Sequence, residues 1–193
     1  MVSSSLNEPA ATRRPSLRAE NPEVYYSDDA VVTVDDATIA ELKRIAAGNP
    51  RLRSRLCTHP DPSSGLHEML IVHHRQAYVR PHKHLGKSES FHLIEGTARV
   101  VIFEENGAIR QVLEMAPYGR GKLCYYRMPD EVFHTILITS EWLVFHETTA
   151  GPFDPSRTVF PDWAPDGSDA AVAQSYMAQL TSRAELATHD RHG

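Results

Sequence analysis

The sequence has only two cysteines, Cys57 and Cys124, which lie far apart and outside any CxxC pair. This spacing argues against a disulfide framework and a zinc knuckle, and it is typical of a reducing compartment. Residues 1–21 are rich in Ser, Pro, Ala and Arg but lack the apolar core of a signal peptide or a membrane span. We therefore expect a cytoplasmic protein with no membrane partner.

Positive charge is also sparse. The formal net charge is -5, and no dense stripe of Lys and Arg is present, so we expect no nucleic-acid partner. No helix-turn-helix pattern precedes the β-rich region, which disfavours a transcription factor. The nearest approach to a basic stripe is Arg51, Arg53 and Arg55. These residues alternate along an expected strand, and we interpret them as a solvated outer face.

The chain has 193 residues, of which 41% are hydrophobic and 23% are charged, as in a soluble globular protein with one core. Residues 56–147 contain short runs of Val, Ile, Tyr, Phe and Thr separated by Gly, Pro and Asn, which predict an all-β core. We divide the chain into a disordered or extended leader (1–29), a β-barrel domain (30–165), and a C-terminal helix and tail (166–193).

Local patterns predict three further elements. A helix should begin at Asp35 and end at Gly48, because apolar residues recur between them at helical spacing. A hairpin should join 98–103 to 108–113 through an Asn-Gly turn. The C-terminal helix should begin at Ser168 as its N-cap.

One group of residues has the spacing of a metal site on neighbouring strands. His82 and His84 point to the same side of an extended chain, because alternate residues of a strand share a face. Glu89 opens the next extended segment, which ends at a turn containing Gly96, and His134 begins a later strand after a proline-led turn. Three imidazoles and one carboxylate suit one divalent ion, with Fe, Mn or Zn favoured and Ni or Co as further candidates. The set leaves positions open for water, substrate or dioxygen.

These residues also carry a family resemblance. The spacing Pro81-His82-Lys-His84, Glu89 and Gly96, with Pro129 before His134, resembles the two signature motifs of the cupin superfamily. Five stretches are similar to the WbuC-type cupin fold metalloproteins, which are named from O-antigen polysaccharide gene clusters: 66–71, 78–82, 87–92, 145–149 and 163–165. The resemblance covers residues 30–165 and implies a single jelly-roll barrel with the metal inside one end, usually as a homodimer.

The chain departs from the superfamily pattern at three positions. Gln76 and Glu131 stand where glycines are expected, and Ile138 replaces a closing asparagine. None of the three is an expected ligand. Glycine often serves positive φ angles, so the geometry of the turns at Gln76 and Glu131 is left open.

Strand parity nominates residues around the metal. Arg80 shares the parity of His82 and, with Lys87, would form a rim that favours an anionic small molecule; the alternative is two solvated basic residues. Phe91 shares the parity of Glu89. Of Tyr125 and Tyr126, one must point inward, and we select Tyr125 as the candidate substrate contact.

Two residues are candidates for moving a proton. Tyr78 shares the parity of His82, and the resemblance of 145–149 to the family makes Glu147 a candidate general base. Sequence alone does not decide whether Phe145 and Glu147 or their neighbours face the barrel. His73 lacks ligand spacing to the site, and we interpret it as a surface or rim residue.

Three functions from different classes fit this pattern. The first is a metal-dependent enzyme of isomerase, epimerase or lyase type that acts on a small oxygenated metabolite or sugar, with a link to polysaccharides. The second is a non-haem iron dioxygenase. The third is a non-catalytic cupin that binds a small molecule.

Overall fold

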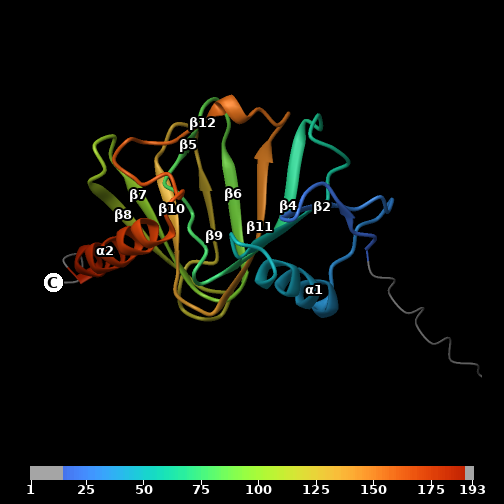
Figure 1. Ribbon diagram of the computed structural model, residues 1–193, viewed down its shortest axis with the longest axis horizontal. Helices are drawn as coiled ribbons and strands as arrows, with labels where there is room; N and C mark the ends of the chain where they lie inside the picture. The colour runs from blue at the N-terminus through green and yellow to red at the C-terminus, as the bar shows by residue number, and fades with distance from the viewer. Residues whose placement is uncertain (1–14, 190–193) are drawn as a thin grey trace, which may run out of the picture.

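The computed structural model describes residues 15–189, so the first half of the predicted leader and the last four residues of the tail lie outside the described part. Figure 1 shows a β-sandwich with a helix on each side. The strands are β1 (Arg18–Ala19), β2 (Val24–Tyr26), β3 (Arg53–Cys57), β4 (Leu66–His74), β5 (Lys83–His84), β6 (Glu89–Glu95), β7 (Ala98–Phe103), β8 (Ile109–Met115), β9 (Tyr125–Met128), β10 (His134–Ile138), β11 (Trp142–Ala150) and β12 (Thr158–Val159). The helices are α1 (Asp36–Ala47), the 3₁₀ turn η1 (Pro155–Arg157) and α2 (Ala170–His189).

The described strands form three sheets. The largest has the order β1-β2-β3-β4-β11-β6-β9, a second has the order β10-β7-β8, and β12 pairs with β5. Neighbouring strands that are distant in sequence, such as β4 and β11, are the long-range pairings of a jelly roll. The predicted fold class, an all-β architecture of packed sheets with an N-terminal helix and a C-terminal helix, is confirmed.

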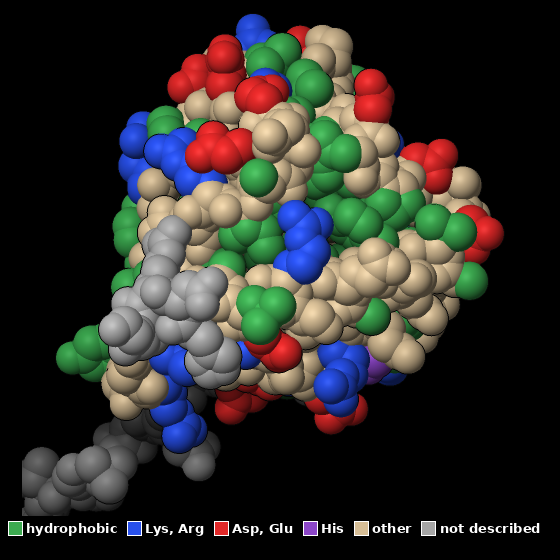
Figure 2. Space-filling model, turned by 90° about the vertical axis from the view of Figure 1, so that its left-hand side faces the viewer, with side chains coloured by type: hydrophobic (Ala, Val, Ile, Leu, Met, Phe, Trp, Pro, Cys, Tyr) green, Lys and Arg blue, Asp and Glu red, His purple; other side chains and the backbone are tan. Residues whose placement is uncertain are grey.

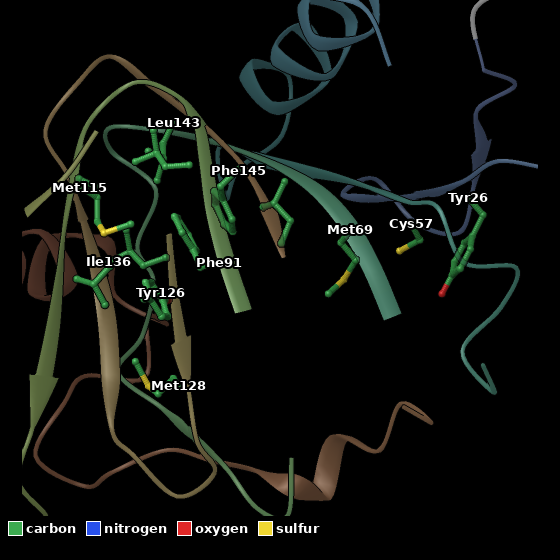
Figure 3. Packing of buried hydrophobic residues seen from close by; sticks show 14 residues of the cluster. Tyr26, Cys57, Met69, Phe91, Met115, Tyr126, Met128, Ile136, Leu143 and Phe145 are labelled. Carbon is green, nitrogen blue, oxygen red and sulfur yellow. The ribbon is translucent and has the colours of Figure 1, made fainter. Parts of the chain in front are cut away.

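The main core lies between the two larger sheets. Phe91, Leu93 and Phe145 of the seven-stranded sheet pack with Val100 and Ile136 of the three-stranded sheet. Figure 3 shows that Met69, Cys57 and Tyr26 continue this cluster along the large sheet, away from the second sheet. The inner face of the large sheet is therefore wider than the barrel core that covers it.

Each helix covers the outer face of one sheet. Leu42 and Ala46 of α1 pack on Leu56, Val72 and other residues of the large sheet. Asp35 caps α1, because its carboxylate accepts a hydrogen bond from the backbone N–H of Thr38 at 2.8 Å, and Gly48 is the C-cap. The predicted bounds of this helix are confirmed.

The second helix begins one residue later than predicted. Leu180 and Ala184 of α2 pack on the outer face of the three-stranded sheet. The Asp169 carboxylate accepts hydrogen bonds from the backbone N–H groups of Ala171 and Val172, so Asp169 is the cap rather than Ser168. Ser168 instead bonds the carboxylate of Asp166. Among the described residues, no helix has the length and apolar character needed to cross a membrane.

The sheet begins earlier than the predicted domain boundary at residue 30. Both β1 and β2 lie within the segment 1–29, and β2 pairs in parallel with β3. Residues 30–34, which look like a strand in the sequence, have no strand assignment. Their place is taken by Val24–Tyr26, whose backbone completes the ladder beside β3.

The predicted hairpin is present as β7 and β8, with a longer turn than a two-residue Asn-Gly loop. Glu104 donates its backbone N–H to Ala108, and Gly107 donates its own to Glu104. Gly107 has φ +82°, the left-handed conformation that glycine adopts at little cost.

Figure 2 shows the side of the molecule that lies to the left in Figure 1, where hydrophobic side chains gather around a basic side chain and acidic groups lie near the rim.

Candidate metal centre

Three histidines converge at one end of the barrel. The ligand nitrogens of His82, His84 and His134 all lie within 4.8 Å of one another. His82 and His134 face each other across an isolated antiparallel bridge, in which each backbone N–H donates to the other residue's carbonyl, at 3.0 and 2.9 Å. His84 lies two residues further on the same side of the chain, as strand alternation requires. The spacing of these nitrogens fits ligands of a single ion.

A buried carboxylate completes the group. Glu89 begins β6 and is 6% exposed. Its carboxylate lies 3.1 Å from Nε2 of His134 and 3.5 Å from Nε2 of His84. The Tyr126 hydroxyl donates to Glu89 Oε1 at 3.3 Å, which helps to hold the carboxylate in place. All four predicted ligands are therefore brought together, and their assignment as ligands stays a prediction.

The histidine rings are oriented by their other nitrogens. Nδ1 of His82 lies 2.8 Å from the carbonyl of Arg80, and Nδ1 of His134 lies 2.9 Å from the carbonyl of Val132. Nδ1 donates in such a contact, which leaves the Nε2 lone pair for an ion. Nδ1 of His84 lies 3.3 Å from the Thr158 hydroxyl. These outer contacts are those expected around metal-binding imidazoles.

The charges of the group also suit a cation. Burial, with the nearby imidazole of His134, lowers the pKa of His82 to about 3, so this ring is neutral at pH 7. Burial opposes ionisation of Glu89, but the imidazoles of His134, His84 and His82 together hold the pKa of Glu89 well below its usual value. Burial opposes the charged form of His134, but the Glu89 carboxylate raises the pKa of His134 above its usual value. A divalent ion would take the place of that proton, and one carboxylate with three imidazoles is a set that fits a first-row divalent ion.

The backbone conformation of Glu131 shows how the turn before His134 forms without the expected glycine. It has φ +64°, so it adopts the left-handed conformation that a glycine would serve at this position. Its backbone N–H donates to the carbonyl of His84 at 2.8 Å. The turn that precedes His134 is therefore attached to the strand that carries His84, and the side chain at 131 is accommodated with some backbone strain.

The four residues open into a cavity of about 730 Å³. Tyr78, Arg80 and Lys87 line it, as parity predicts for the first two. The Tyr78 hydroxyl donates to the carbonyl of Pro165 at 2.7 Å, and burial raises its pKa. The Arg80 guanidinium lies over the ring of Phe160, 4.7 Å from its centroid. The cavity has the size of a site for a small metabolite.

Glu147 lies in the same cavity, which decides the parity of β11. Phe145 and Glu147 face the barrel, whereas Val144 packs toward α1. Burial, together with the Glu89 carboxylate, raises the pKa of Glu147 to about 7. A carboxyl group with such a pKa can both accept and donate a proton near neutral pH.

Two predicted substrate contacts are placed elsewhere. Phe91 is 1% exposed and belongs to the core, where its ring stacks on Phe145 at 4.2 Å and on Tyr126 at 5.2 Å. Tyr125 is 52% exposed, and its hydroxyl bonds Ser90 at 3.1 Å. Neither lines the cavity, because Phe91 is covered by other rings and Tyr125 points out of β9. The inward aromatic of this pair is Tyr126.

Three basic residues at the other end of the cavity were not recognised from the sequence as part of a site. Arg53 and Arg55 line it rather than forming a solvated outer face, and His73 lines it rather than lying on the surface. The strand register places Arg53 opposite His73. Alternation along 53–57 was the available signal, but it does not tell which of two faces is inward.

Comparisons with known proteins find similarity over part of the chain only. The family model described as "Domain of unknown function (DUF6016)" matches residues 34–115. No curated protein matches the chain. Among solved structures, a protein from Shewanella oneidensis is 8% identical, with a TM-score of 0.43 over 53% of this chain and 66% of the other.

Two enzyme-related structures are similar to the same extent. An oxalate decarboxylase from Bacillus subtilis, with Mn(II) centres, is 19% identical, with a TM-score of 0.41 over 50% of this chain and 24% of the other. CapF with the inhibitor 3-isopropenyl-tropolone is 19% identical, with a TM-score of 0.46 over 58% of this chain and 32% of the other. The chain spans less than two thirds of each. Values this low do not assign an activity to the chain.

Proposed function

We propose that the protein is a mononuclear metal-dependent cupin enzyme that acts on a small oxygenated metabolite or sugar. The observation that carries this proposal is the joint opening of His82, His84, Glu89 and His134 into a cavity that also holds Glu147. A bound divalent ion would polarise a carbonyl or hydroxyl oxygen of the ligand as a Lewis acid. The cavity volume of about 730 Å³ suits a ligand of that size.

The chain's own residues can move a proton beside such an oxygen. Glu147 is partly buried in the cavity wall and has a pKa of about 7, so it can take a proton from carbon or oxygen and return it. Tyr78 is less suited to this role, because its hydroxyl already donates to a backbone carbonyl and burial raises its pKa. We therefore assign the proton transfer of an isomerase, epimerase or lyase reaction to Glu147.

Substitution of Glu147 by Gln tests this role. The variant keeps the shape of the side chain but removes the base, so we expect at least a hundredfold slower exchange of a substrate C–H proton with solvent. Exchange is followed by NMR in D₂O across a panel of sugars and hydroxy acids, with metal content measured in parallel. Exchange at the wild-type rate in a metal-loaded Glu147→Gln variant would contradict the assignment.

The ion decides between this function and its alternatives. Purified without a histidine tag, the protein should contain about one equivalent of metal by elemental analysis. Iron with substrate-dependent oxygen uptake would favour a non-haem dioxygenase. A loaded protein that binds ligands but changes none of them would favour a binding cupin. The WbuC-type resemblance, and with it a link to polysaccharides, rests on the five sequence stretches and belongs to this proposal.

We further propose that the protein is a homodimer. The large sheet ends at β1 on one side and at β9 on the other, and a second copy would cover such edges. Light scattering coupled to size exclusion should give twice the chain mass of 21.6 kDa. A monomer mass that does not change with concentration would contradict this prediction.

A further inference from the structure

The end of the cavity away from the metal centre is lined by basic side chains. Arg53 and Arg55 project from β3 and His73 from β4, on the inner face of the large sheet. Strands β3 and β6 are three neighbours apart in this sheet, which corresponds to about 14 Å at the usual strand spacing. The basic end and Glu89 of the metal centre are thus separate parts of one cavity of about 730 Å³.

This end carries more positive than negative charge. Glu23 pairs with Arg53 at 2.8 Å and with Arg51 at 3.4 Å, so one carboxylate serves two guanidinium groups. Arg55 forms no ion pair within residues 15–189, and its Nη1 contacts the sulfur of Met69 at 3.8 Å. Glu147 lines the same cavity, and Arg55 partly opposes the rise in the pKa of Glu147, but the two groups do not form an ion pair. The Arg55 guanidinium therefore has donors to offer a ligand.

His73 supplies a second, independent sign of a ligand. It is 5% exposed, and its Nδ1 atom is buried without a hydrogen-bond partner in the described structure. Burial, together with Arg53, Arg55 and Arg51, lowers the pKa of His73 well below its usual value, so the ring is neutral. A buried polar atom without a partner is costly, and a ligand atom in the cavity would remove that cost.

We propose that Arg55 and His73 form an anion subsite that binds a carboxylate or phosphate group of the ligand. The ligand is then elongated, with its oxygenated group at the metal centre and its anionic group at β3. The placement of the oxygenated group at the metal centre rests on the proposed function, whereas the anion subsite itself needs no metal. A bidentate bond from a guanidinium to such a group is charge-assisted, so its loss should weaken binding about ten- to a hundredfold.

The test uses sodium phosphate and sodium succinate as probes, at constant ionic strength against sodium chloride. Binding is measured by thermal shift and calorimetry for the wild type, Arg55→Met, Arg80→Met and the control Arg120→Met, which changes an exposed loop residue outside the cavity. We expect one or both probes to stabilise the wild type and Arg120→Met, with at least tenfold weaker affinity in Arg55→Met. The stronger probe identifies the anionic class.

Variants lacking His84 separate this proposal from the metal centre. In the His84→Ala background, anion binding should persist, and it should fall again when Arg55→Met is added. The subsite would be overturned by any of three results. Arg55→Met could keep full affinity for the probes, only Arg80→Met could lose that affinity, or His84→Ala could lose it by itself. If Arg55→Met does not fold, Arg55→Lys decides, since it keeps the charge but lacks the fork and should still weaken binding severalfold.

Discussion

Replacing His84 with alanine should remove most of the bound metal. His84 offers Nε2 to the same point as His82 and His134, within 4.8 Å, so its loss leaves an incomplete donor set. Loss of a partner behind a ligand already costs about 10- to 100-fold in metal affinity, so loss of a ligand should cost at least about 100-fold. Because an ion stabilises the state that binds it, the variant should also melt below the loaded wild type.

Elemental analysis and competition with a chelator measure this effect. The matched control is His92→Ala, because His92 lies on β6 close to Glu89 but is exposed on the outer face. The control should retain the wild-type metal content and affinity. A full equivalent of metal with unchanged affinity in His84→Ala would show that the ligand assignment is wrong.

Phe91→Ala should be the most destabilising change in the barrel core. Phe91 is 1% exposed and stacks on two other rings, so its truncation removes buried apolar area and leaves a cavity between the sheets. Such a change lowers the free energy of unfolding by about 3–5 kcal/mol. Denaturant unfolding of the metal-free protein measures it without the contribution of an ion.

The control for this variant is Ile94→Ala on the same strand. Ile94 is 40% exposed, so its truncation should change stability much less. The comparison also separates two interpretations of Phe91. If Phe91→Ala kept wild-type stability but lost ligand binding, Phe91 would be a substrate contact, as strand parity alone indicates, rather than a core residue.

Local spacing was sufficient to predict the elements that position the metal centre. The helix between Asp35 and Gly48 and the hairpin that follows Gly96 depend on interactions between near neighbours, which the sequence displays directly. His82 and His84 share a face because of strand period alone. Their proximity to His134 was predicted from motif spacing and is produced by the isolated antiparallel bridge between residues 82 and 134.

The pairing of distant strands determines which face of each strand points inward, a question that the sequence left open. Alternation along β3 shows that Arg53 and Arg55 share a face, but the face is set by α1, which covers Leu56 from the other side. In the same way, Tyr126 points inward because β9 pairs with β6 in the register Phe91 to Tyr126. Glu131 shows a different limit, since a non-glycine residue holds a left-handed turn only when surrounding contacts enforce it.

The positions of the ligands within the sheets have a consequence for folding kinetics. Glu89 belongs to the seven-stranded sheet, His134 to the three-stranded sheet and His84 to the two-stranded one, so the site exists only when all three have docked. Such distant pairings close late, because the entropy of long loops must be overcome first. An ion that joins the three sheets would therefore act as a latch on the finished barrel: it would slow unfolding and leave the rate of folding nearly unchanged.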